Sequence, residues 1–447
     1  MSALTLQPDV FRRLAAQIAE LSAEYLSGAD ARSLIPSLSG AEVAAMFDGA
    51  VPEAGVGDEV VDDLARLTNA VRIGNGRLFP YVVTPGESVA ALADLYASVL
   101  NQNVTAWRSA PAAVAVEQCV IRWIAAAVGC AGFHGSLTSG GSAANLMGLA
   151  MARESRLPGN DEGATPGVVY ASSEVHMSIP KAVGLLGLGQ RNLRLIPTDD
   201  RFRIDLDALR RAIAEDEAKG RPGVAIVASA GTVNTGAIDD LAGAAALATE
   251  HDLWLHIDGA SLADSVSMDA HKWLYQPLDC SILLYRDPEI ARRTFAHSDD
   301  YVRPLSDDPV EGFAFFEQSL ELSRRFRALK LWASIRYHGL SAFRAAIAAD
   351  LRHALLLAER VEGEPALQLL APVELSAVCF RWNDGTGEDA LDDRNAAILS
   401  RMNRRGRVAI SNATIRGSFA LRACFVNHLT TDDDVVAIVD EVLVAAC

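Results

Sequence analysis

The sequence predicts an α/β protein with a mostly parallel central sheet. Short β-branched runs alternate with helical patterns through the middle of the chain, as in strands joined by crossover helices. Half of the 447 residues are apolar and 22% are charged, so the chain can bury a large core and is not disordered. An aspartate and a histidine follow two of the apolar runs, where sheets of this class bind ligands.

The elements begin with an amphipathic helical pattern over residues 8–27, and a segment punctuated by proline and glycine follows it. Helical patterns at 88–100 and 114–128 precede the alternating region. The strand-like runs of that region lie at 167–171, 193–197, 224–229, 253–258 and 280–285. Its helical patterns lie at 142–153, 206–219 and 241–251.

The pattern changes after residue 286, where a smaller α+β domain is expected. Residues 319–360 read as a long helix broken near Gly339. Strands at 373–382 and 419–425 and helices at 391–405 and 432–445 complete this part. The sequence therefore predicts an N-terminal helical segment (1–85), a large α/β domain (86–325) and a small C-terminal domain (326–447).

The net charge and the spacing of the cysteines exclude several kinds of partner and site. The formal net charge of −17 argues against a nucleic-acid partner and against an anionic membrane surface. The six cysteines form no Cys-x-x-Cys pair, so we expect reduced thiols and no metal site. The first residues carry no basic or apolar secretory signal, and the uncharged stretch 123–152 is interrupted by glycines and polar residues. We expect a cytoplasmic protein that does not enter a membrane.

Lys272 is the first candidate for chemistry, because it is followed by Trp273, Leu274 and Tyr275. Burial lowers the pKa of a lysine and makes its amine a nucleophile toward an aldehyde. The alternative is a surface lysine whose stem packs on the tryptophan.

Asp258 ends an apolar strand-like run, where its carboxylate can pair with a protonated pyridine nitrogen. The alternative is an aspartate that caps a helix or a turn. His176 lies between a predicted strand and helix and can face the same site, although a lone histidine is more often structural.

The segment Thr-Ser-Gly-Gly-Ser-Ala-Ala-Asn at 138–145 is a candidate phosphate loop. Gly140 and Gly141 allow close approach of the backbone, and Ser142 begins a helix whose N–H groups can bind an anion. The segment is neither a Walker A loop nor a Gly-x-Gly-x-x-Gly fingerprint, and small-residue turns before helices are common. Only together do the four features, a phosphate cradle, an aromatic stacking partner, a carboxylate and a lysine, indicate pyridoxal 5′-phosphate.

With these residues in place, the sequence resembles the group II pyridoxal-phosphate-dependent amino-acid decarboxylases, which include aromatic-L-amino-acid and glutamate decarboxylases. The match to their cofactor-lysine signature comprises Ser265-Val, Lys272-Trp-Leu, Leu278-Asp-Cys280, Leu283 and Arg286. The resemblance runs from about Gly74 to the C-terminus and also includes Glu117, residues 138–145 and Arg324. It implies the fold-type I architecture of aspartate aminotransferase.

The resemblance also implies roles for individual residues. Lys272 would be the Schiff-base lysine, Asp258 the partner of the pyridine nitrogen, and His176 and Ala260 the groups on either face of the ring. Gly140, Gly141, Ser142 and His271 would surround the phosphate, and Thr232 the ring hydroxyl. Tyr301 resembles the mobile-loop tyrosine of the aromatic branch, which is thought to protonate the carbanion; the alternative is a surface tyrosine.

One spacing departs from that family. Asp258 and Lys272 are only 14 residues apart, because Gly259 to Leu262 joins almost directly to Ala263. Either the intervening loop and helix have been lost, or the sequence as given omits them. The close match on both sides favours omission.

Substrate and assembly follow less directly from the sequence. Tyr81, Val82, Asn103, Trp107 and Arg422 are the candidate substrate contacts. The position of Tyr301 favours decarboxylation of an aromatic L-amino acid. One alternative is an acidic or aliphatic substrate. The others are an aldehyde synthase, another fold-type I enzyme such as a carbon–sulfur lyase, and an inactive paralogue that acts as a binding protein. The resemblance implies a homodimer with the active site at its interface.

Overall fold

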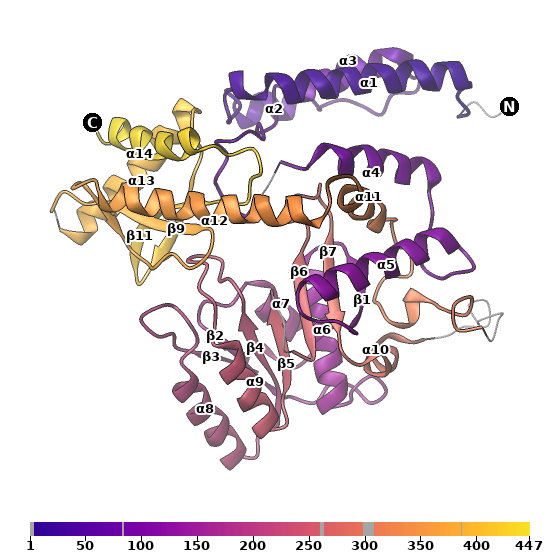
Figure 1. Ribbon diagram of the computed structural model, residues 1–447, viewed down its shortest axis with the longest axis vertical. Helices are drawn as coiled ribbons and strands as arrows, with labels where there is room; N and C mark the ends of the chain where they lie inside the picture. The colour runs from indigo at the N-terminus through magenta and orange to yellow at the C-terminus, as the bar shows by residue number, and fades with distance from the viewer. Residues whose placement is uncertain (1–3, 83–84, 260–262, 298–307, 386) are drawn as a thin grey trace.

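A computed structural model describes residues 4–82, 85–259, 263–297, 308–385 and 387–447 (Figure 1). Its largest feature is a seven-stranded sheet in the order β1-β7-β6-β5-β4-β2-β3. The strands are β1 (His134–Thr138), β2 (Val168–Ser172), β3 (Leu193–Ile196), β4 (Gly223–Ser229), β5 (Trp254–Asp258), β6 (Ser265–Asp269) and β7 (Ser281–Tyr285). All neighbours from β3 to β6 are parallel, and β7 runs antiparallel to both β6 and β1. The predicted α/β class with a mostly parallel sheet is confirmed.

Helices cover both faces of this sheet. On one face α6 (Gly141–Arg156) contacts five of the strands and packs beside α7 (Ser178–Leu185) and α10 (Pro288–Phe295). On the other face lie α5 (Pro111–Ala127), α8 (Leu206–Ala218) and α9 (Leu241–Glu250). Each face has its own apolar core, so β4 to β6 are buried on both sides.

The N-terminal part is helical and lies along one side of the molecule (Figure 1). It contains α1 (Pro8–Gly28), α2 (Gly40–Ala45) and α3 (Val60–Leu67). No described residue of α1 or α3 is buried. Next, α4 (Ser88–Leu100) packs against α11 (Ala328–His338).

The C-terminal part surrounds a second, antiparallel sheet in the order β10-β11-β9-β8. Its strands are β8 (Leu367–Leu369), β9 (Ala377–Trp382), β10 (Ser411–Ile415) and β11 (Ser418–Cys424). The helices α12 (Leu340–Glu362), α13 (Glu388–Arg405) and α14 (Asp432–Ala446) pack on it around a separate apolar core.

The predicted helix over 319–360 is only partly correct. The break at Gly339 is confirmed, because this residue separates α11 from α12 at φ 73°. Residues 319–327 are not helical. The reason is Arg324, whose buried guanidinium donates to the carbonyl oxygens of Val104 and Leu137 and thereby fixes a non-helical segment against β1.

The connection between β5 and β6 is unusually short. The two strands are parallel neighbours, with His256 opposite Ser265 and Asp258 opposite Ser267, yet only residues 259–264 join them. Parallel strands ordinarily need a crossover of about a dozen residues or more. No helix among the described residues is long and apolar enough to cross a membrane.

Candidate active site

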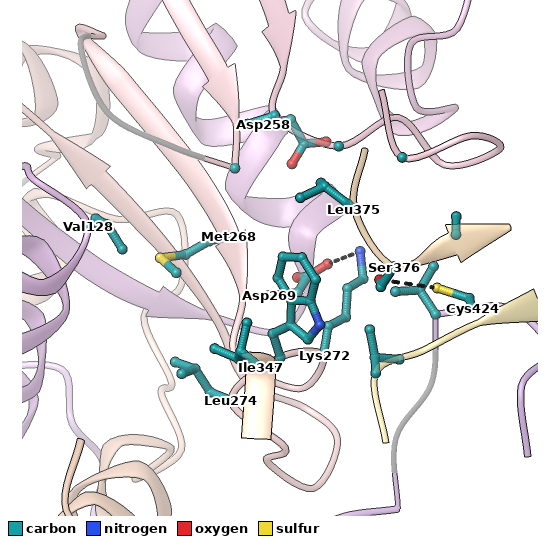
Figure 2. Close-up of a pocket in the computed structure, with 18 of the residues that line it drawn as sticks. Val128, Asp258, Met268, Asp269, Lys272, Leu274, Ile347, Leu375, Ser376 and Cys424 are labelled. Carbon is teal, nitrogen blue, oxygen red and sulfur yellow. Dashed lines mark hydrogen bonds and ion pairs between the residues drawn. The ribbon is translucent and has the colours of Figure 1, made fainter. Parts of the chain in front are cut away.

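A cavity of about 370 Å³ lies where β5 and β6 end, between the large sheet and the C-terminal part (Figure 2). Its polar lining includes Asp258, Asp269, Lys272, Thr232 and Arg422. Much of the remaining lining is apolar and comes from α5, β6 and α12. The structure thus brings together Asp258 and Lys272, the two residues on which the sequence prediction mainly rests.

Lys272 forms an ion pair with Asp269, whose Oδ2 lies 2.7 Å from Nζ (Figure 2). Burial acts to lower the pKa of Lys272, but the Asp269 carboxylate outweighs it, and the pKa is raised. Burial acts to raise the pKa of Asp269, and the lysine ammonium reverses this, so the pKa of Asp269 is lowered. Both shifts favour the charged pair.

Asp258 ends β5 and is held from two directions. The Ser267 hydroxyl on β6 lies 3.0 Å from its Oδ1, and the Asn145 amide on α6 donates to its Oδ2 at 3.4 Å. The carboxylate therefore has a fixed orientation at the end of the strand, with its side chain on the wall of the cavity.

His176 lies in the turn before α7, and its Nδ1 is 2.7 Å from the Ser178 hydroxyl. Burial lowers the pKa of His176, and the charges of Asp258 and Lys272 also act on it. Because its pKa lies below the usual 6.5, the neutral form of the imidazole is favoured at pH 7.

The candidate phosphate loop begins α6. Gly140 precedes the helix and Gly141 is its first residue, with the Ser142 hydroxyl exposed in the first turn. A Cβ on Gly141 would lie 2.9 Å from the Asp269 carboxylate oxygens, so only glycine fits there. Nearby, His271 Nδ1 lies 3.0 Å from the Cys280 carbonyl oxygen, and its Nε2 is 3.9 Å from Asp269.

Thr232 is buried in the cavity wall, where its hydroxyl lies 2.9 Å from that of Thr235. Two further predicted site residues, Ala260 and Tyr301, lie outside the described residues.

The candidate substrate residues are dispersed within one chain. Val82 and Arg422 line the cavity. Arg422 donates to the carbonyl oxygens of Tyr81, Val233 and Asn234, so its guanidinium is already engaged.

Tyr81, Asn103 and Trp107 are not among the described residues that line the cavity. Tyr81 is exposed, and Asn103 accepts a hydrogen bond from the Arg324 backbone N–H at 2.8 Å. Trp107 packs on the core around α5.

The sequence prediction missed several polar residues that support the site. These residues are Asn145, Ser178, His256, Ser267 and Asp269. A signal for the β6 members was present, because Ser265, Ser267 and Asp269 alternate with apolar residues and so share one face of a strand.

The comparisons with known proteins agree with this geometry. The family model "Pyridoxal-dependent decarboxylase conserved domain" matches residues 42–262 and 259–383, and this chain belongs to that family. The two matched segments meet at the short β5–β6 connection.

Among the relatives, an aromatic-L-amino-acid decarboxylase of Bacillus atrophaeus is 31% identical over 97% of this chain and 95% of its own length. A phenylacetaldehyde synthase of Petunia hybrida is 28% identical over 77% of this chain and 75% of its own. A crystal structure of Oryza sativa TDC with PLP and tryptamine superposes with a TM-score of 0.92 at 24% identity and covers 99% of both chains, which supports the fold.

The residues present fit the pyridoxal phosphate that the family uses. An amine that can bond to an aldehyde and a carboxylate for a pyridine nitrogen line the cavity, and the imidazole of His176, whose pKa both of their charges affect, lies in the turn before α7. The first turn of α6 adds backbone N–H groups for a phosphate, and Gly140, which precedes the helix, has open space where a side chain would lie.

Proposed function

We propose that this protein decarboxylates an aromatic L-amino acid to the corresponding amine and carbon dioxide. The proposal rests mainly on one observation, the placement of Lys272 and Asp258 in one largely apolar cavity. In this proposal Lys272 holds the cofactor covalently, Asp258 pairs with its pyridine nitrogen and His176 stacks on its ring. Gly140, Gly141, Ser142, Thr232 and His271 surround its phosphate and ring hydroxyl, and Ala260 lies under the ring.

The chemistry divides between the cofactor and the protein. When bound, pyridoxal phosphate supplies an electron-poor ring that accepts the electrons left behind when carbon dioxide departs. Asp269 holds the Lys272 side chain in the cavity through the 2.7 Å ion pair, although the amine must be neutral to react. The apolar lining excludes water from the substrate carboxylate, which favours loss of its charge. Tyr301 is the proposed proton donor to the product.

The cavity lining favours an aromatic over an acidic substrate. The side chains of Ile124, Val128 and Met268 form an apolar wall. Arg422 is a poor partner for a substrate carboxylate, because its guanidinium already bonds three backbone carbonyl oxygens. The aromatic-L-amino-acid decarboxylase among the relatives points the same way. Tyr81, Val82, Asn103 and Trp107 remain the proposed substrate contacts, of which the last two would have to act from a partner subunit.

An aldehyde synthase is the second candidate, because a phenylacetaldehyde synthase is among the relatives. The two activities differ at the proton donor. We expect Tyr301→Phe to lower the yield of amine and raise that of aldehyde with consumption of oxygen. Unchanged products would remove Tyr301 from its proposed role.

We also propose a cytoplasmic homodimer with the site at its interface, and the three-part division 1–85, 86–325 and 326–447. The described apolar side chains Phe11, Ile18 and Leu26 of α1 are 46%, 40% and 51% exposed, which a partner subunit would cover. Sedimentation measures the assembly, and a fully active monomer would contradict it.

A panel of amino acids, scored for released carbon dioxide, tests the proposed function. We expect release from an aromatic amino acid without peroxide or ammonia. Borohydride should fix the cofactor to Lys272 in the wild-type protein and not in Lys272→Ala. A colourless protein that borohydride does not modify would instead indicate the binding-protein alternative.

A further inference from the structure

A continuous chain of buried hydrogen bonds runs beneath the site. The Trp254 indole nitrogen lies 2.8 Å from the Ser265 hydroxyl, which lies 2.8 Å from His256 Nδ1. His256 Nε2 is in turn 2.8 Å from Asn145 Oδ1. All four residues are at most 4% exposed, so water does not compete for these bonds.

The donors and acceptors along this chain can have only one direction. The Asp258 carboxylate can only accept, so the amide nitrogen of Asn145 points to Asp258 and its oxygen to His256 Nε2, which must donate. Nδ1 of the neutral ring then accepts the proton of Ser265, whose oxygen accepts from the Trp254 N–H. His256 is therefore protonated at Nε2 and donates to Asn145 Oδ1. Burial lowers the pKa of His256, which agrees with a neutral ring. The amide oxygen of Asn145 is thus fixed toward His256, and its nitrogen points the other way.

The amide nitrogen of Asn145 then contacts Asp258 directly and reaches His176 through Ser178. It donates to Asp258 Oδ2 at 3.4 Å and to the Ser178 hydroxyl at 2.9 Å. Because Ser178 accepts this bond, its proton is free for His176 Nδ1 at 2.7 Å. The Ser178 backbone N–H donates to the same nitrogen at 3.3 Å, so Nδ1 is an acceptor and His176 is held as the tautomer with its proton on Nε2.

Packing leaves His256 no alternative position. A Cβ on Gly148 of α6 would lie 2.6 Å from Cε1 and 2.7 Å from Nδ1 of this ring, so the helix passes directly against it. The Ser267 hydroxyl lies between Asn145 Oδ1, at 2.5 Å, and Asp258 Oδ1, at 3.0 Å, and these two acceptors share its single proton.

We propose that Asn145, oriented by the buried His256, is the positioning residue that sets both the direction of the Asp258 carboxylate and the tautomer of His176. This inference rests on the proposed function, since it assumes that these two groups meet the cofactor ring. Neither Asn145 nor His256 contacts the cofactor in this arrangement, and both act through the groups that do.

Discrimination between two cofactors tests the Asp258 branch. The apoprotein is titrated with pyridoxal phosphate and with its carbocyclic analogue, in which CH replaces the ring nitrogen. We expect the wild-type protein to prefer the natural cofactor, and Asn145→Leu and His256→Met to lose about tenfold of that preference, the typical effect of a hydrogen bond to a charged group. His256→Gln is the matched control, because its amide N–H can replace the imidazole N–H and should keep most of the preference.

A role in stability alone would weaken both cofactors equally and leave their ratio unchanged, and an unchanged ratio in His256→Met would overturn the inference. If these larger substitutions do not fold, Ser178→Ala removes one hydroxyl and tests the His176 branch. Ser178→Ala leaves only the longer bond from the backbone N–H, at 3.3 Å, to hold His176 Nδ1 as an acceptor. We expect the nitrogen-15 signals of the His176 ring in the histidine-labelled variant to shift from one tautomer toward a mixture of the two, and unchanged signals would refute that branch. A wild-type protein that does not bind pyridoxal phosphate would instead refute the proposed function.

Discussion

The buried ion pair between Glu117 and Arg324 is expected to be a principal support of the cofactor site. Arg324 Nη2 lies 2.5 Å from Glu117 Oε1, and the two side chains are 1% and 0% exposed. The same guanidinium donates to the Leu137 carbonyl oxygen at 3.0 Å, and Glu117 accepts from the Leu137 N–H at 2.9 Å. The pair therefore holds both backbone groups of a β1 residue that precedes the phosphate loop.

Glu117→Gln removes the negative charge and leaves the Arg324 cation buried. At an effective dielectric constant of about 20, charges 2.5 Å apart attract by about 7 kcal/mol. Arg324 keeps its bonds to the carbonyl oxygens of Val104 and Leu137, which offset part of this loss. We expect a net cost of about 3–5 kcal/mol, the usual result of breaking a buried pair from one side.

Thermal unfolding measures this cost, and we expect the Tm of Glu117→Gln to fall by several degrees. Glu250→Gln is the matched control, because its pair with Arg210 has a 2.8 Å separation but both side chains are more than half exposed. That control should change stability by less than about 1 kcal/mol. Equal Tm values for the two variants would refute the reasoning. Replacing both Glu117 and Arg324 by methionine should recover much of the loss, because no unpaired charge then remains.

Three further substitutions test other parts of the site. Asp269→Asn removes the main charge that opposes the effect of burial on Lys272, so its pKa should fall and labelling by pyridoxal with cyanoborohydride should begin at lower pH; an unchanged pH profile would contradict this. Burial raises the pKa of Asp350 to about 6 from 3.8, so the folded state binds this proton more tightly than the unfolded state. The free energy of unfolding should therefore decrease by about 2 kcal/mol between pH 4 and 6 through this group, and Asp350→Asn, measured by urea unfolding, should lack that decrease. Gly148→Ala should displace the His256 ring and lower the Tm by more than an alanine introduced at the exposed Gly55, which has open space around it.

Local pattern was sufficient to predict most of the large domain. The strands β2 to β5 and β7 were predicted within a residue or two, because each is a buried apolar run bounded by turns. β1 and β6 were missed, since polar residues interrupt the apolar pattern in both strands, and those of β6 contact the site. The non-helical segment 319–327 was missed for a related reason: a tertiary contact of Arg324 overrides the helical composition of its neighbours.

Some residues of the candidate site could likewise be predicted from the sequence, and others could not. Lys272 and Asp258 could be predicted because each lies in a recognisable motif, and the structure brings both to one cavity. The supporting role of Asn145 could not be predicted, because it depends on which residue of β5 lies opposite which residue of β6. A shift of one residue would turn Ser265 and Ser267 away from α6 and remove those bonds.

The short β5–β6 connection affects the packing on one face of the sheet more than that on the other. The β4–α9–β5 crossover lies on the face of α5, and a right-handed crossover from β5 to β6 would continue across that same face. On β6 this face carries Val266 and Met268, whereas Ser267 faces Asn145 on the opposite helix, α6. The contacts that orient Asp258 therefore come from the α6 face. A shortened crossover removes packing from the α5 and α9 side of the sheet, and the hydrogen bonds to the cofactor-facing carboxylate do not depend on it.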